Sequence, residues 1–102
     1  MKGTEKQIKW ASEISETVVA ILKAAIEDFG TNYSNDQTTP AIINGLNSRI
    51  DAINNAEYAG DIIALFKGVR KTGDVRADAS RLFAIYQVSV PANAGQKKIL
   101  CK

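Results

Sequence analysis

Apolar residues recur at steps of three and four along the first third of the chain, which is the period of an amphipathic helix. The stripe consists of Ile8, Ala11, Ile14, Val18, Ile21, Leu22, Ala25 and Phe29. Thr4 followed by Gln7 fits a capping box, in which each side chain bonds the other residue's backbone N–H. Gly30 offers a stop. The pattern therefore predicts a long helix over residues 5–29.

Residues 30–39 have no apolar period and are rich in turn formers, which predicts a loop. A second helix is then expected to begin at Pro40, because a proline at the first helical position loses no hydrogen bond. Thr39 is its predicted N-cap. The apolar stripe of this helix consists of Ile42, Ile43, Leu46, Ile50 and Ile53.

The asparagine pair at 54–55 leaves two interpretations open. Either the second asparagine caps a third helix over residues 56–67, or one bent helix runs over residues 40–67. Further along, Asp74 is a suitable N-cap for a last helix over residues 75–87.

These elements predict an all-α fold, a small bundle of three to four helices joined by short loops. We expect a single helical domain over residues 1–91 and a flexible basic tail over residues 92–102, which contains one glycine and three lysines. The alternative is an α+β fold in which residues 88–90 or 97–101 pair in a short C-terminal hairpin.

Charge divides the chain more sharply than its net value of +2 suggests. Residues 1–66 hold five basic and nine acidic side chains, a net of −4, whereas residues 67–102 hold eight basic and two acidic ones, a net of +6. These two poles can attract partners of opposite sign. The acidic set that offers a contact face comprises Glu13, Glu16, Glu27, Asp28, Asp36, Asp51, Glu57 and Asp61.

The chain has no histidine and a single cysteine, Cys101, so it lacks the commonest general acid–base and the commonest metal ligand. Carboxylates four residues apart occur at Glu57 and Asp61 and at Asp74 and Asp78, but two carboxylates are too few for a tight metal site. We therefore expect a protein that is not an enzyme and needs no cofactor or metal. Without an apolar leader or a membrane-length apolar run, it is expected in the cytoplasm.

The strongest candidate site is the basic loop, defined as residues 67–76. Its cations are Lys67, Arg70, Lys71 and Arg76. Gly68 and Gly73 let the backbone approach an anion closely. Alternatively, Lys67, Arg70 and Lys71 favour the negative C-terminal end of the preceding helix and stay solvated. The two glycines match the first half of a phosphate-binding loop. Asp74 and Val75 stand where that motif requires Lys and Ser or Thr, which argues against nucleotide hydrolysis.

Trp10 lies off the apolar stripe of the first helix, among Lys6, Lys9 and Glu13. An aromatic residue in such surroundings can anchor a protein partner or stack a nucleic-acid base. Alternatively, it closes the edge of the core and turns its indole N–H to solvent. Trp10 therefore joins the basic-loop cations as a candidate partner-binding residue.

Residues 4–14 read Thr-Glu-Lys-Gln-Ile-Lys-Trp-Ala-Ser-Glu-Ile. This segment resembles a recurrent opening, T-E-K-Q-I-x-W-A-x-x-I, of small uncharacterised proteins from phages and mobile elements of Gram-positive bacteria. The resemblance implies a helical protein of phage or mobile-element type. Such small proteins often act by stoichiometric binding, as do inhibitors of host defence nucleases such as anti-CRISPR proteins.

Two functions follow as hypotheses. The first is a non-enzymatic protein-binding module that occupies a larger partner, such as a defence nuclease or its nucleic-acid complex, through its basic or its acidic face. The second is a nucleic-acid-binding accessory protein whose basic loop and following helix contact phosphates. A membrane partner is not expected, and helices with one wide apolar face also permit a homodimer.

Overall fold

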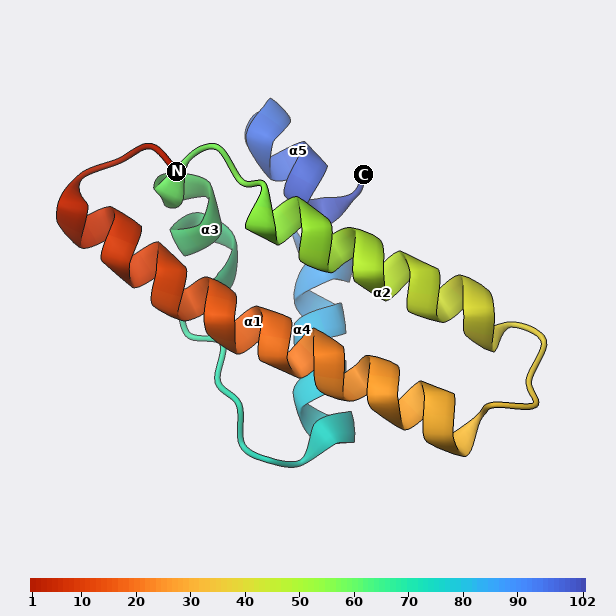
Figure 1. The fold of residues 1–102 in the computed structure, drawn as a ribbon. Helices are drawn as coiled ribbons and strands as arrows, with labels where there is room; N and C mark the ends of the chain where they lie inside the picture. The colour runs from red at the N-terminus through yellow and green to blue at the C-terminus, as the bar shows by residue number, and fades with distance from the viewer.

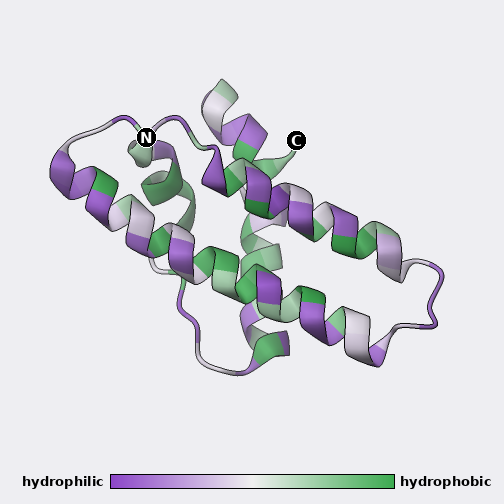
Figure 2. Ribbon diagram, in the orientation of Figure 1, coloured by the Kyte–Doolittle hydropathy of each residue, from purple (hydrophilic) through white to green (hydrophobic).

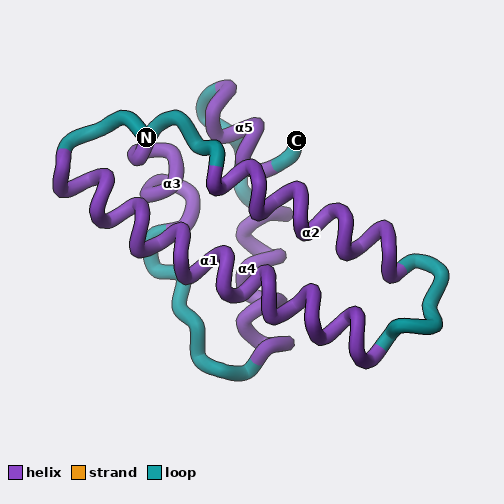
Figure 3. Tube along the Cα trace, viewed as in Figure 1, coloured by secondary structure: helices purple, strands orange, loops and turns teal.

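The computed structural model describes all 102 residues and contains five α-helices and no β-strand (Figure 1; Figure 3). The helices are α1 (Glu5–Asn32), α2 (Thr39–Asn54), α3 (Ala59–Phe66), α4 (Val75–Val88) and α5 (Ala94–Leu100). The predicted all-α fold is confirmed. The α+β alternative is wrong, since neither of the proposed hairpin segments pairs with another.

Helix α1 begins with the predicted capping box. The Gln7 backbone N–H donates to Thr4 Oγ1 at 3.2 Å, and the Thr4 N–H donates to Gln7 Oε1 at 3.1 Å. The predicted stop at Gly30 is wrong, because the helix continues for two more residues. Its last turn is held by the Tyr33 N–H, which donates to the Phe29 carbonyl at 3.0 Å, and by the two aromatic rings, whose centroids lie 5.6 Å apart.

Helix α2 starts one residue earlier than predicted. Thr38 occupies the N-cap position, and Thr39 is the first helical residue. The Thr39 side chain does not cap the helix but donates its hydroxyl hydrogen to the Tyr33 carbonyl at 2.6 Å, a contact across the loop that no local pattern announces.

Helices α2 and α3 are separate, so the interpretation of residues 40–67 as one bent helix is wrong. The third helix exists, but it begins at Ala59 and not at residue 56. The intervening backbone pairs instead with the start of the chain. The Lys2 N–H donates to the Glu57 carbonyl at 2.6 Å, and the Ala59 N–H donates to the Lys2 carbonyl at 2.8 Å. These bonds hold the backbone around Tyr58 in an extended conformation, so the helix cannot begin before Ala59.

The predicted flexible tail, residues 92–102, contains helix α5, so that prediction is corrected. Asn93 caps this helix by accepting the Gln96 N–H at 2.9 Å. Ile99 and Leu100 are buried, with exposed fractions of 2% and 3%. Burial of two large aliphatic side chains stabilises a helix of only seven residues that would not persist in isolation.

Helices α1 and α2 form a long antiparallel hairpin, α4 crosses behind it, and α3 and α5 close one end (Figure 1). The molecule measures 45 × 27 × 21 Å. Most of α3 is hydrophobic (Figure 2), and its Phe66 packs on Tyr86 of α4 with ring centroids 5.6 Å apart. The largest fully buried side chains come from every helix, namely Val18, Ile21, Leu22, Ile53, Ile62, Phe66, Leu82 and Ile99. None of the five helices combines the length and apolar character needed to cross a bilayer.

Candidate functional site

The basic loop connects the end of α3 to the start of α4 and lies along the lower side of the molecule in Figure 1. Gly68 and Gly73 adopt φ angles of 91° and 96°, a region that glycine enters without strain. Asp74 caps α4 as predicted, since its carboxylate accepts the Ala77 N–H at 3.1 Å. The cap fixes the end of the loop that enters α4, and the two glycines allow the turns of the backbone within it.

The carboxylate of Asp78 holds the middle of the loop. Asp78 is only 3% exposed and accepts the Thr72 N–H at 3.0 Å, the Thr72 hydroxyl at 2.6 Å and the Gly73 N–H at 3.2 Å. These bonds, the Thr72 hydroxyl foremost, lower the pKa of Asp78 to about 2 despite its burial. A charged carboxylate thus fastens the loop to the first turns of α4.

Two of the cations near this loop pair with carboxylates of the same molecule. Arg81 donates to Asp78 Oδ1 at 2.6 Å. Arg76, one of the predicted partner-binding residues, has its Nε 3.5 Å from Asp28 Oδ2 of α1. Its charge therefore serves at least in part to join α4 to α1.

The other three predicted cations, Lys67, Arg70 and Lys71, are exposed and take part in no ion pair or side-chain hydrogen bond. They lie within five residues of one another, on a loop that Asp78 fixes in place. The structure thus separates the basic loop into one paired cation and three free ones.

A cavity of about 340 Å³ opens between the basic loop and α4, and we call it the loop cavity. It is lined by Gly68, Val69, Arg70, Thr72, Asp78, Arg81, Leu82 and Ile85. Sequence reasoning missed Arg81 and the apolar floor. The spacing of Asp78 and Arg81, three residues apart on one helix, was a signal that these side chains meet. The floor had no such signal, because it depends on how the loop folds back over α4.

Trp10 is 48% exposed and forms no hydrogen bond or cation–π contact. The one arginine stacked on aromatic rings is Arg49, whose guanidinium carbon lies 4.2 Å from the Tyr86 ring centroid. Trp10 lies on α1, and no hydrogen bond or cation–π contact joins it to the basic loop, so the two candidates are separate features of the surface.

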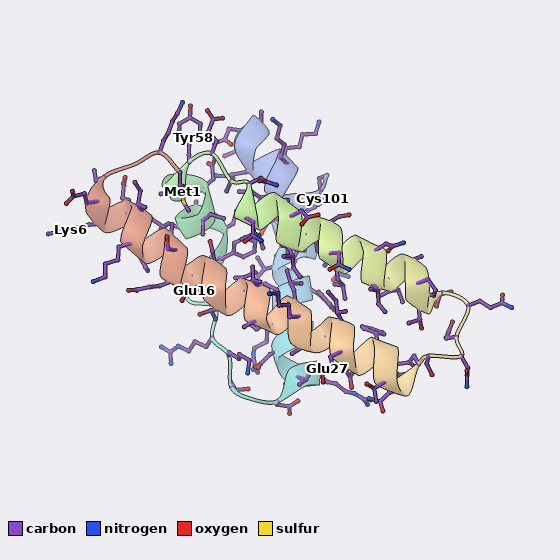
Figure 4. The ribbon with its side chains drawn as sticks, viewed as in Figure 1. Met1, Lys6, Glu16, Glu27, Tyr58 and Cys101 are labelled. Carbon is purple, nitrogen blue, oxygen red and sulfur yellow. The ribbon has the colours of Figure 1, made fainter.

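The predicted acidic set does not form one free face. Asp28 pairs with Arg76, Glu57 Oε1 lies 3.2 Å from Lys2 Nζ, and Asp36 accepts the N–H and the hydroxyl of Thr38. Asp61 is 7% exposed and accepts a hydrogen bond from the Asn93 amide at 3.0 Å. The exposed members without such partners are Glu13, Glu16, Glu27 and Asp51. Glu16 and Glu27 are spread along α1 among cations such as Lys6 (Figure 4).

The two carboxylates of the predicted pair Glu57 and Asp61 bind different partners. Glu57 precedes α3 and faces Lys2, whereas Asp61 contacts Asn93. No group of three or more potential metal ligands is assembled anywhere in the chain, and Cys101 is exposed at the C-cap of α5.

No protein-family model, no curated protein and no solved structure matches this chain. Its own geometry provides a fixed loop with three free cations, one of which, Arg70, lines a cavity whose wall is partly apolar and partly polar.

Proposed function

We propose that this protein is a non-enzymatic binding module that acts stoichiometrically by docking the basic loop on an acidic surface of a larger protein. The observation that carries the proposal is the contrast within the loop. Arg76 is paired inside the molecule, whereas Lys67, Arg70 and Lys71 have no internal anion. Charges without an internal partner are available for an external one.

The anchoring of the loop supports the same function. A loop that must be ordered on binding reduces affinity, because its conformational entropy is lost in the complex. Thr72 and Gly73 are already bonded to Asp78, so much of that ordering is complete before a partner arrives.

The opening segment, residues 4–14, extends the proposal to origin and target. Its resemblance to small phage and mobile-element proteins supports a role as an inhibitor of a host defence nuclease, in the manner of an anti-CRISPR protein. Trp10 lies in that segment and is half exposed, so it is a second candidate anchor on the same partner.

The test begins with affinity capture of a partner from host lysate and inhibition assays on purified defence nucleases. The dissociation constant of the purified complex is then compared with that of a triple variant, Lys67→Ala, Arg70→Ala and Lys71→Ala. We expect affinity to fall at least about tenfold. The matched control replaces Lys23, Lys97 and Lys98, which are exposed, unpaired and away from Trp10 in the sequence, and so removes the same net charge. Wild-type affinity in the loop variant, or no partner and no inhibited nuclease, would reject the proposal.

Binding to nucleic acid is the second candidate, because three clustered free cations also suit a phosphate backbone. In that case the logarithm of the binding constant falls steeply with the logarithm of salt concentration, and the triple variant lowers the slope by about 2 to 3. The loop cavity favours a protein partner, since no aromatic side chain lines it to stack a base.

A further inference from the structure

We propose that the loop cavity receives an aliphatic side chain from an acidic segment of the partner protein. This inference rests on the proposed function and adds the chemistry of the ligand. The partner segment would carry carboxylates on both sides of a leucine-like residue, so that the cavity binds its charge and its apolar side chain at the same time.

The floor of the cavity supplies the apolar part of this recognition. Val69, Leu82 and Ile85 are its hydrophobic members. Leu82 is 1% exposed, so it belongs to the core, whereas Val69 and Ile85 are only partly buried. The volume of about 340 Å³ lies in the range of pockets that hold small ligands. An aliphatic side chain placed there would cover the two partly buried residues and remove water from them.

The rim supplies the cationic part. Arg70 has no internal partner, and Arg81 remains 58% exposed at its side chain while one of its nitrogens binds Asp78. A guanidinium group carries five N–H donors, so Arg81 keeps donors for a second carboxylate. Two arginines beside an apolar floor complement a carboxylate next to an aliphatic group.

The one anion that lines the cavity does not oppose this ligand. Asp78 is 3% exposed, and its two oxygens already accept bonds from Thr72, Gly73 and Arg81. Its negative charge is therefore balanced within the cavity wall, and the free charges at the rim are positive.

Peptide titrations of the isotope-labelled protein, followed by NMR chemical shifts, test the inference. The first peptide has a leucine between two pairs of glutamates, the second has serine in place of leucine, and a thymidine oligonucleotide of equal charge is the third probe. We expect the leucine peptide to shift the amides of Val69, Thr72 and Ile85 and to bind at least about fivefold more tightly than the serine peptide.

The outcomes separate this inference from the proposed function. Equal affinity of the two peptides at the basic loop overturns the cavity inference and leaves the charge-based function standing. Tighter binding of the oligonucleotide overturns it in favour of nucleic acid. No shift with any probe at millimolar concentration rejects both proposals.

A variant localises the effect. Ile85→Ser should abolish the preference for leucine over serine, whereas Ile42→Ser, at an exposed aliphatic residue of α2 outside the cavity, should keep it. If Ile85→Ser does not fold, Val69→Ser in the loop gives the same comparison. An unchanged preference in a folded cavity variant contradicts the inference.

Discussion

At the residue scale, the carboxylate of Asp78 holds the basic loop against α4 and links the stability of the protein to pH. Its pKa in the folded protein, about 2, is below the ordinary value of 3.8, so the unfolded chain binds the proton more readily. The stabilisation that this charge provides is complete above pH 3.8 and is lost as the pH falls toward 2. Acid is therefore expected to loosen the basic loop from α4.

Replacement of Asp78 by asparagine tests this linkage. The variant should be less stable than the wild type at neutral pH, and the difference in unfolding free energy should shrink as the pH falls from 3.8 to 2. Urea denaturation followed by circular dichroism at a series of pH values measures the difference. Asp51→Asn, at an exposed carboxylate without a recorded partner, is the control and should show a small, nearly constant difference. A pH-independent effect of Asp78→Asn would contradict the assigned role.

At the element scale, the docking of α5 depends on a close approach to α3. A β-carbon added to Gly95 would collide with Asp61 Oδ2, whereas one added to Gly45 in α2 would meet no atom within 4 Å. Gly95→Ala should therefore destabilise the protein by about 1–3 kcal/mol. Gly45→Ala should stabilise it by about 0.5–1 kcal/mol, because alanine is the better helix former.

Thermal unfolding measures both alanine variants, and tryptic cleavage after Lys97 or Lys98 reports on α5 directly. The cleavage rate should rise in Gly95→Ala and stay unchanged in Gly45→Ala. Equal cleavage in all three proteins would mean that α5 does not depend on this contact.

The sequence predicted well the elements that have a long stretch of periodic apolar residues or a local cap. The apolar stripe and the Thr4–Gln7 box located the start of α1, and Asp74 located the start of α4. Helix α5 was not predicted because seven residues are too few to show the helical period, although its Asn93 cap is visible in the sequence. The asparagine pair at 54–55 offered a break between α2 and α3 as one of two interpretations. The later start of α3, at Ala59, goes with backbone pairing to Lys2, far away in the chain, which no local pattern announces.

The candidate site divides in the same way. The sequence located the cations of the basic loop because charge is visible residue by residue. It could not tell that Arg76 is paired, since its partner Asp28 lies on another helix. Nor could it show that Lys67, Arg70 and Lys71 stay free, which becomes apparent only when every acidic side chain has a position.

At the scale of the whole molecule, the first residues of the chain bond to residues 57–59, and we call this contact the N-terminal joint. Met1 and Tyr58 lie together at the end closed by α3 (Figure 4), and the Lys2 backbone bonds to Glu57 and Ala59. The ion pair between the Lys2 and Glu57 side chains is exposed on both sides, so it contributes little. The backbone bonds matter more, because Ala59 is fully buried and its N–H has no solvent to replace Lys2.

Gly3 is the residue on which this joint depends. Its φ of +153° is one that side chains with a β-carbon rarely adopt, and an added β-carbon would lie 3.1 Å from that of Ala59. Gly3→Ala should therefore cost about 1–2 kcal/mol of unfolding free energy and speed hydrogen exchange at the Ala59 amide. Gly60→Ala, a neighbouring site with no atom within 4 Å, is the matched control and should leave that amide protected. Ala59 begins the helix that leads into the basic loop, so this contact bears on the position of that loop. Unchanged exchange at the Ala59 amide in Gly3→Ala would mean that α3 does not depend on the conformation of Gly3.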